Sequence, residues 1–227
     1  MKLLALETST EACSCALYVD GTISQRVEFA PRKHAELILP MAEQLLAEAQ
    51  LLPAQLDGVT FGQGPGSFTG VRIACSVAQG IAFAVNIPVA PVSSLAALAQ
   101  HFYQTQGHEK ICVAFDARMK EVYWGIYQLN QQGLMQLQGE ECVCAAHQVP
   151  LPDEKNSWVG VGSGWAAYSD ALSERLAGYV QHYDSEIYLH AAALIPFALA
   201  MFAQQQVFSA ETVTPVYIRN KIVSLKK

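Results

Sequence analysis

The sequence predicts an α/β protein of two similar lobes, and three observations carry this prediction. Apolar strand-like runs alternate with long segments of helical periodicity. An apolar strand that ends on a carboxylate and continues into a turn and a returning strand occurs twice, at residues 2–8 and 110–117. The 227 residues suffice for two lobes of about 110 each, and Gly107 to Glu109 mark the boundary. We therefore expect an N-terminal lobe over 1–106 and a C-terminal lobe over 107–227, whose last helix could pack back on the first lobe.

The first lobe begins with three predicted strands, over 2–7, 13–19 and 22–29, and Asp20-Gly21 forms a hairpin turn between the last two. A helix is expected over 31–50, because Leu37, Ile38, Met41, Leu45 and Leu46 recur on one face. Pro40 would kink this helix.

A strand over 58–62 then leads through a glycine-rich loop into a helix over 68–86. Small residues along this helix permit the close approach of another backbone. Pro88 ends the helix, a short strand follows over 89–92, and Ser93 or Ser94 can cap a helix that runs to about residue 104.

The second lobe repeats the pattern with strands over 110–117 and 121–129. Further strands are expected near 134–144 and over 158–161, followed by a helix over 165–177 that ends at Gly178. A last helix is predicted from about 187 to 206, before a tail over 213–219.

Composition restricts the class of protein. With 52% hydrophobic and 15% charged residues, the chain should bury a large core, and a partner should cover part of its surface. A net charge of -6 argues against tight binding of nucleic acid by this chain alone. The longest apolar stretch, 191–203, is too short to span a bilayer, so no membrane segment is expected.

The six cysteines are expected to be reduced thiols of a cytoplasmic protein. Cys13 and Cys15, like Cys142 and Cys144, lie two residues apart in strand-like runs, so each pair should face one side of a sheet. A zinc site built from the two pairs is the alternative interpretation.

The glycine loop, residues 60–72, is the strongest local motif. A strand, a glycine loop and a helix start together suit an anion, because free N–H groups and the helix dipole point at the loop. The loop nevertheless lacks the lysine of a P-loop, since no lysine lies between Lys33 and Lys110. The motif alone leaves two interpretations open: a structural turn in which Ser67 caps the helix, and a phosphate cradle.

Two carboxylates end the equivalent strands, Glu7 and Asp116. Such a pair could hold Mg²⁺ with a nucleotide across a cleft, or each acid could cap its own turn. His34 has Ile38 where a helical metal site would need a second histidine, so no metal site is expected. No serine or cysteine stands in a recognisable nucleophile motif.

These residues carry a resemblance to a known family. The chain resembles the bacterial TsaB (YeaZ) family of tRNA threonylcarbamoyladenosine biosynthesis proteins in five places: residues 6–9, His34, residues 56–59, the string from Gly62 to Arg72 and the closing 215–219. The resemblance covers the whole chain. It implies two RNase-H-like lobes of the actin/Hsp70 (ASKHA) type. It also implies a non-catalytic partner of the related enzyme TsaD, which with the ATPase TsaE transfers threonylcarbamoyl from its adenylate to N6 of the adenosine 3′ of the tRNA anticodon.

The chain departs from the catalytic relative where that protein binds metal through two histidines. In the matching stretch, 91–98, Ser94 and Leu98 take the ligand positions, and leucine cannot ligate a metal. The resemblance therefore implies no catalytic residue, no metal and no cofactor of its own, with a nucleotide only at a subunit junction. It leaves a vestigial nucleotide loop of Thr8, Ser9, Gly64, Gly66, Ser67 and Asp116.

The helices at 34–50 and 68–86 are the expected partner surface. By resemblance they join TsaD, or a second copy of the chain when TsaD is absent, whereas tRNA is reached only through the complex. The expected contact residues are His34, Leu37, Met41, Leu45, Arg72, Ala74, Ala78, Ile81 and Ala82. The alternative function is a small ASKHA-type ATPase or kinase that uses Glu7, Asp116 and the glycine loop.

Overall fold

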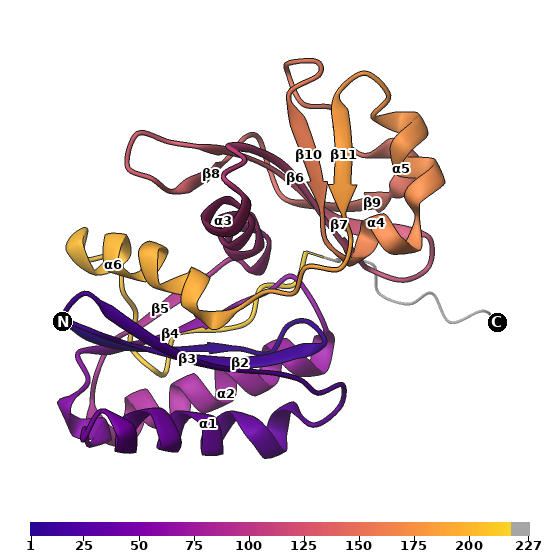
Figure 1. The fold of residues 1–227 in the computed structure, drawn as a ribbon. Helices are drawn as coiled ribbons and strands as arrows, with labels where there is room; N and C mark the ends of the chain where they lie inside the picture. The colour runs from indigo at the N-terminus through magenta and orange to yellow at the C-terminus, as the bar shows by residue number, and fades with distance from the viewer. Residues whose placement is uncertain (219–227) are drawn as a thin grey trace.

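The computed structural model describes residues 1–218, which form two lobes, each built on one β-sheet (Figure 1). The basic residues Arg219, Lys221, Lys226 and Lys227 lie outside the described residues. The N-terminal sheet has the order β3-β2-β1-β4-β5. Its strands are β1 (Lys2–Glu7), β2 (Ala12–Val19), β3 (Thr22–Phe29), β4 (Gly58–Gly62) and β5 (Val89–Val92).

Strand directions follow from the connections. β1 and β2 are antiparallel, and β2 turns into β3 at Asp20 and Gly21, which both have positive φ (45° and 102°) as a tight hairpin requires. β4 and β5 return through helices, so they run parallel to β1.

The second sheet repeats this plan, with the order β11-β10-β6-β7-β8 and β9 paired to β7. β6 is antiparallel to β7 and parallel to β10, as β1 is to β2 and β4. The strands are β6 (Lys110–Asp116), β7 (Glu121–Leu129), β8 (Met135–Leu137), β9 (Cys142–Ala145), β10 (Trp158–Val161) and β11 (Val180–Asp184). The internal repeat therefore corresponds to two RNase-H-like lobes of the actin/Hsp70 type.

Helices α1 (His34–Glu48) and α2 (Phe68–Val85) cover one face of the first sheet (Figure 1). The prediction that α1 begins at residue 31 was wrong, because Arg32 has a left-handed φ of 70°. Pro40 lies inside α1, as expected. α2 is long and apolar enough to cross a membrane by length and composition, with a mean hydropathy of 1.5. Its Ala74, Ala78 and Ala82 are fully buried in the lobe core, but only 33% of the helix is buried.

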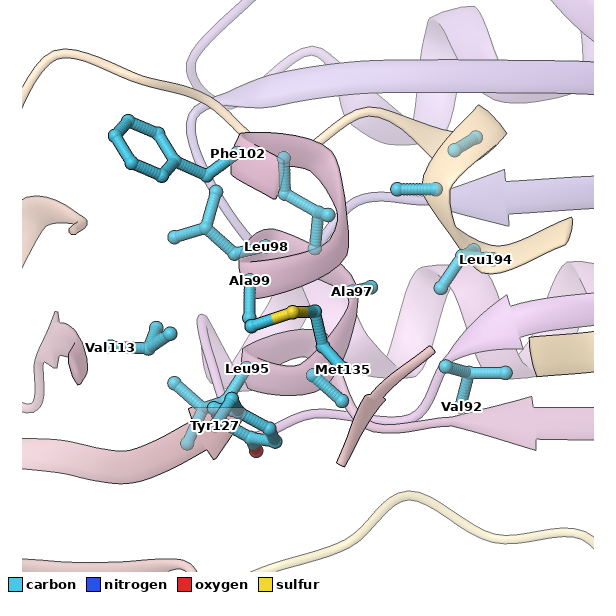
Figure 2. Close-up of a cluster of buried hydrophobic side chains, with 14 of the residues drawn as sticks. Val92, Leu95, Ala97, Leu98, Ala99, Phe102, Val113, Tyr127, Met135 and Leu194 are labelled. Atoms are coloured by element: carbon cyan, nitrogen blue, oxygen red, sulfur yellow. The ribbon is translucent and has the colours of Figure 1, made fainter. Parts of the chain in front are cut away.

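Helix α3 (Ser94–Gln106) lies between the two sheets (Figure 2). Its Leu95, Leu98 and Phe102 share one core cluster with Val92 of the first lobe and Val113 of the second. The division at residues 106 and 107 stays a prediction, because this cluster joins both lobes.

The C-terminal half differs from the sequence prediction in three places. The helix expected over 165–177 is two short helices, α4 (Ser163–Ala167) and α5 (Ser169–Arg175), since the backbone of Tyr168 (φ -138°, ψ 36°) is not helical and interrupts it. Strand β11 was not predicted, because its sequence is largely polar and exposed.

The last helix is also shorter than the predicted 187–206. It consists of a 3₁₀ turn at Ala191–Leu194 and α6 (Ile195–Ala203), in which Pro196 occupies the first turn, where proline is tolerated. α6 does pack back on the first lobe: a Cβ on Gly58 of β4 would lie 2.0 Å from the Phe202 ring.

Candidate functional site: the glycine loop and the cleft between the lobes

The glycine loop joins β4 to α2 and lies against the turn that follows β1. Ser67 N–H donates to Ser9 O at 2.8 Å, and Thr8 Oγ1 donates to Gly70 O at 2.6 Å. A Cβ on Gly70 would lie 1.9 Å from Thr8 O, so only glycine permits this contact.

The same loop uses its own N–H donors. Gly70 N–H donates to Ser67 Oγ at 3.3 Å, and Val71 N–H donates to Ser67 O at 2.9 Å. Ser67 is the helix cap that the sequence predicted. These three donors, at residues 67, 70 and 71, are therefore occupied within the protein, which favours the structural turn over a phosphate cradle.

Glu7 ends β1 but does not face the cleft. Its side chain is 0% exposed, Oε1 accepts the Ser9 N–H, and Oε2 has no hydrogen-bond partner within residues 1–218. A Cβ on Gly62 would lie 1.8 Å from Oε2, so the missing side chain of Gly62 makes room for this carboxylate. Desolvation by burial raises the pKa of Glu7 to about 7, although hydrogen bonds from Ser9 and Thr8 oppose the shift.

Asp116 ends β6 and does line the cleft. Its Oδ1 accepts hydrogen bonds from Arg118 N–H at 2.7 Å and from the Tyr168 hydroxyl at 2.9 Å. Its Oδ2 lies 2.9 Å from Arg118 Nη1 in an ion pair. Both acids thus cap the turns that follow them, and the structure does not bring them together as a metal-binding pair.

The cleft between the lobes has a volume of about 1040 Å³. Of the expected vestigial loop, Ser9, Gly66, Ser67 and Asp116 line it, whereas Thr8 and Gly64 are buried and do not. Its charged lining consists of Glu11 and Asp116 against Arg32, Arg72 and Arg118.

The C-terminal tail crosses the glycine loop and closes one side of the cleft. Val216 N–H donates to Gln63 O at 2.9 Å, and Val216, Tyr217 and Ile218 line the cleft. The Arg72 guanidinium lies 3.2 Å from the centroid of the Phe68 ring and 4.8 Å from that of Tyr217. The sequence analysis gave no role to Tyr217, Arg118 or Tyr168. Tyr217 and Tyr168 contact residues that are distant in the sequence, and the turn after β6 sets the contact of Arg118 with Asp116.

Several expected partner contacts are not available on the surface. Met41, Leu45, Ala74, Ala78 and Ala82 are 0–7% exposed, because their sides of α1 and α2 pack on the first sheet. The prediction that these five side chains contact a partner was therefore wrong for this conformation. His34 is also buried, with Nε2 2.9 Å from Thr10 O, and Leu37, Arg72 and Ile81 are partly exposed.

The two residues that the resemblance aligns with metal ligands of the catalytic relative are part of the core. Ser94 and Leu98 are both 0% exposed, and Ser94 Oγ accepts the Gly64 N–H at 3.2 Å. Within residues 1–218, no three or more His, Cys, Asp or Glu side chains form a group that could hold a metal ion. The two cysteine pairs lie in separate core clusters, so they do not form the alternative zinc site.

Comparisons with known proteins agree with this geometry. A family model described as TsaD, tRNA N6-adenosine threonylcarbamoyltransferase, matches residues 23–219. The chain is 39% identical to the tRNA threonylcarbamoyladenosine biosynthesis protein TsaB of Escherichia coli, over 98% of this chain and 96% of that protein. It is 38% identical to the protein of the same name from Haemophilus influenzae, over 98% and 95% of the two chains.

A solved structure, YeaZ from Pseudomonas aeruginosa, superposes with a TM-score of 0.89 at 45% identity, covering 95% of this chain and 99% of that one. Sequence identity over nearly full length and the shared two-lobed fold lead to one assignment. The chain belongs to the TsaB (YeaZ) family of tRNA threonylcarbamoyladenosine biosynthesis proteins.

Proposed function

We propose that this protein is a non-catalytic subunit of the cytoplasmic machinery that transfers threonylcarbamoyl to N6 of the adenosine 3′ of the tRNA anticodon. It supports the transfer by binding TsaD and TsaE, and it reaches tRNA only within that complex. The names of its relatives support the pathway. The state of Glu7 carries the non-catalytic assignment: the acid that would face a nucleotide is fully buried, and Gly62 packs against it.

The partner surface is the outer face of α1 and α2. We define this outer face by side chains at helical spacing that are exposed or partly exposed: Leu37, Ile73, Ser76, Val77, Gly80 and Ala84. Phe83 beside it is 66% exposed. An apolar helical face of this kind suits the same helix pair of TsaD, or of a second copy when TsaD is absent.

Reconstitution of threonylcarbamoyl transfer tests the proposal. TsaD, TsaE, tRNA and threonylcarbamoyl-adenylate are incubated with and without this chain, and ATP hydrolysis by the chain alone is measured in parallel. We expect transfer to require the chain, and the chain alone to be inert. Full transfer in its absence would contradict the proposal.

Gly80→Arg tests the outer face. A Cβ on Gly80 would meet nothing within 4 Å, so a long charged side chain fits the isolated protein and blocks only a partner. We expect at least about a tenfold loss of TsaD affinity, because the interface would have to bury an unpaired charge. The matched control is Gln104→Arg, which places the same charge at an exposed position of α3. If the two variants bind TsaD with equal affinity, the outer face is not the TsaD-binding surface. Ala78→Trp is unsuitable as a test, since Ala78 lies in the core and the variant would disturb folding.

A second function, hydrolysis of ATP or transfer of its phosphate by this chain, is favoured by one observation. The cleft of about 1040 Å³, lined by Asp116 and three arginines, is large enough for a nucleotide. Mg²⁺-dependent ATP hydrolysis that disappears in Asp116→Ala would support this alternative over the non-catalytic role.

A further inference from the structure

Two cysteine thiols on β9 lie side by side and take no part in the site described above. Cys142 Sγ and Cys144 Sγ are 3.8 Å apart, and both residues are half-buried. The other four cysteines are buried. Cys142 also lines a cavity of about 490 Å³ on the second lobe, away from the cleft, so small solutes can reach its thiol.

The strand geometry opposes a disulfide between these thiols. Residues two apart on a strand are separated by about 6.6 Å along its axis, whereas a disulfide needs Cβ atoms about 3.8 Å apart. β9 is held to β7 by backbone pairing, with Cys142 opposite Trp124 and Cys144 opposite Val122. Closing the S–S bond would therefore require β9 to leave this pairing.

An inserted metal ion fits the same geometry without such a change. With metal–thiolate bonds of about 2.3 Å, two sulfurs are about 3.8 Å apart at a tetrahedral angle and about 4.6 Å apart in a linear arrangement. The observed 3.8 Å equals the tetrahedral value, so a linear arrangement requires side-chain rotations that move the sulfurs about 0.8 Å apart.

The donor set selects the kind of ion. Thiolates favour soft ions, and a structural zinc site requires four protein ligands. Within residues 1–218 no group of three or more ligating side chains exists, so this site offers two sulfurs. We propose that Cys142 and Cys144 form a binding site for a soft monovalent cation of the Cu(I) class, held between two thiolates.

The surroundings act differently on the two thiols of this pair. The hydrogen bond between the two thiols lowers the pKa of Cys142, which favours its thiolate, although burial and the charge of Glu140 oppose the shift. The same hydrogen bond and burial raise the pKa of Cys144 well above its ordinary value. Burial raises the pKa of Cys13 to about 12 and also raises that of Cys75. Cys142 therefore has the lowered pKa of these thiols, and a metal ion bound by the pair must displace the proton of Cys144.

Competition with a chromogenic chelator tests the proposal. The full-length protein, reduced with a phosphine to avoid thiol chelators, is titrated with Cu(I) against bicinchoninate. Alkylation by iodoacetamide is then mapped by mass spectrometry. We expect one Cu(I) per chain and at least about tenfold slower alkylation of Cys142 and Cys144. The single variants Cys142→Ser and Cys144→Ser should each lose at least about tenfold in affinity, whereas the control Cys75→Ala should not.

Failure to retain Cu(I) against the chelator would overturn the proposal. So would equal Cu(I) binding by the variant in which both cysteines are serine, or retention of Zn²⁺ in preference to Cu(I). If that variant does not fold, the alkylation rates of the wild-type protein with and without Cu(I) still decide the question.

Discussion

Replacing Glu7 by glutamine should change how the stability of this protein depends on pH. The carboxyl group is fully buried at the end of β1, and desolvation raises its pKa from 4.5 to about 7. Between these values the folded protein holds the proton more tightly than the unfolded chain, so wild-type stability falls as the pH rises through this window. Glutamine has the same shape and no proton to lose.

The expected size follows from the pKa difference. A change from 4.5 to about 7 corresponds to about 3 kcal/mol at about 1.4 kcal/mol for each pH unit. The free energy of unfolding of Glu7→Gln, minus that of the wild type, should therefore rise by about 3 kcal/mol between pH 4.5 and 8. The absolute offset depends on how the amide meets Ser9 and Ser94, so the change with pH is the quantity to measure.

Urea unfolding followed by tryptophan fluorescence at pH 4.5, 6, 7 and 8 provides the measurement. Glu36→Gln is the control, because Glu36 is exposed on α1 and its difference from the wild type should vary little. If the Glu7→Gln difference stays constant to within about 0.5 kcal/mol, the carboxyl group is not held in the desolvated state that the fold implies.

Two further predictions concern the glycine loop and the tail. Gly70→Ala should lower the free energy of unfolding by about 3 kcal/mol, because its Cβ would lie 1.9 Å from the backbone oxygen of Thr8. Urea unfolding measures this loss, and a clearly smaller loss would contradict the close packing at Gly70. Arg72→Ala should remove the guanidinium from between Phe68 and the tail, a contact of about 0.5–1 kcal/mol. The Val216 amide, which donates to Gln63 O, should then exchange its hydrogen about two- to fivefold faster, and an unchanged rate would show that Arg72 does not hold the tail.

Much of the fold could be predicted because its signals are local. The apolar run at 2–7, the Asp20-Gly21 turn and the serine caps at Ser67 and Ser93 each act within a few residues. The repeated strand, acid and hairpin predicted two lobes, and the two sheets have the same strand order. Polar β11 escaped prediction because pairing with β10, and not its own periodicity, makes it a strand.

The candidate site was predicted only in part, since a helical pattern reveals an apolar face but not its occupant. The small residues of α2 were equally compatible with packing against a partner and with packing against the protein's own sheet. The structure places Ala74 and Ala78 against that sheet and leaves Ser76 and Gly80 on the outer face. Burial is a property of the assembled lobe, so no spacing in the sequence could have distinguished the sheet-facing residues of α2 from those on its outer face.

By itself the sequence determined the two-lobed α/β plan, the glycine loop and the family resemblance, because each depends on neighbouring residues or on one string of letters. Only the tertiary structure decided what the two acids do. Glu7 is enclosed by Gly62 and Ser94, which come from β4 and α3, whereas Asp116 stays at the cleft beside Arg118. Two carboxylates at equivalent strand ends thus have different surroundings, because desolvation depends on which distant segments pack over each one.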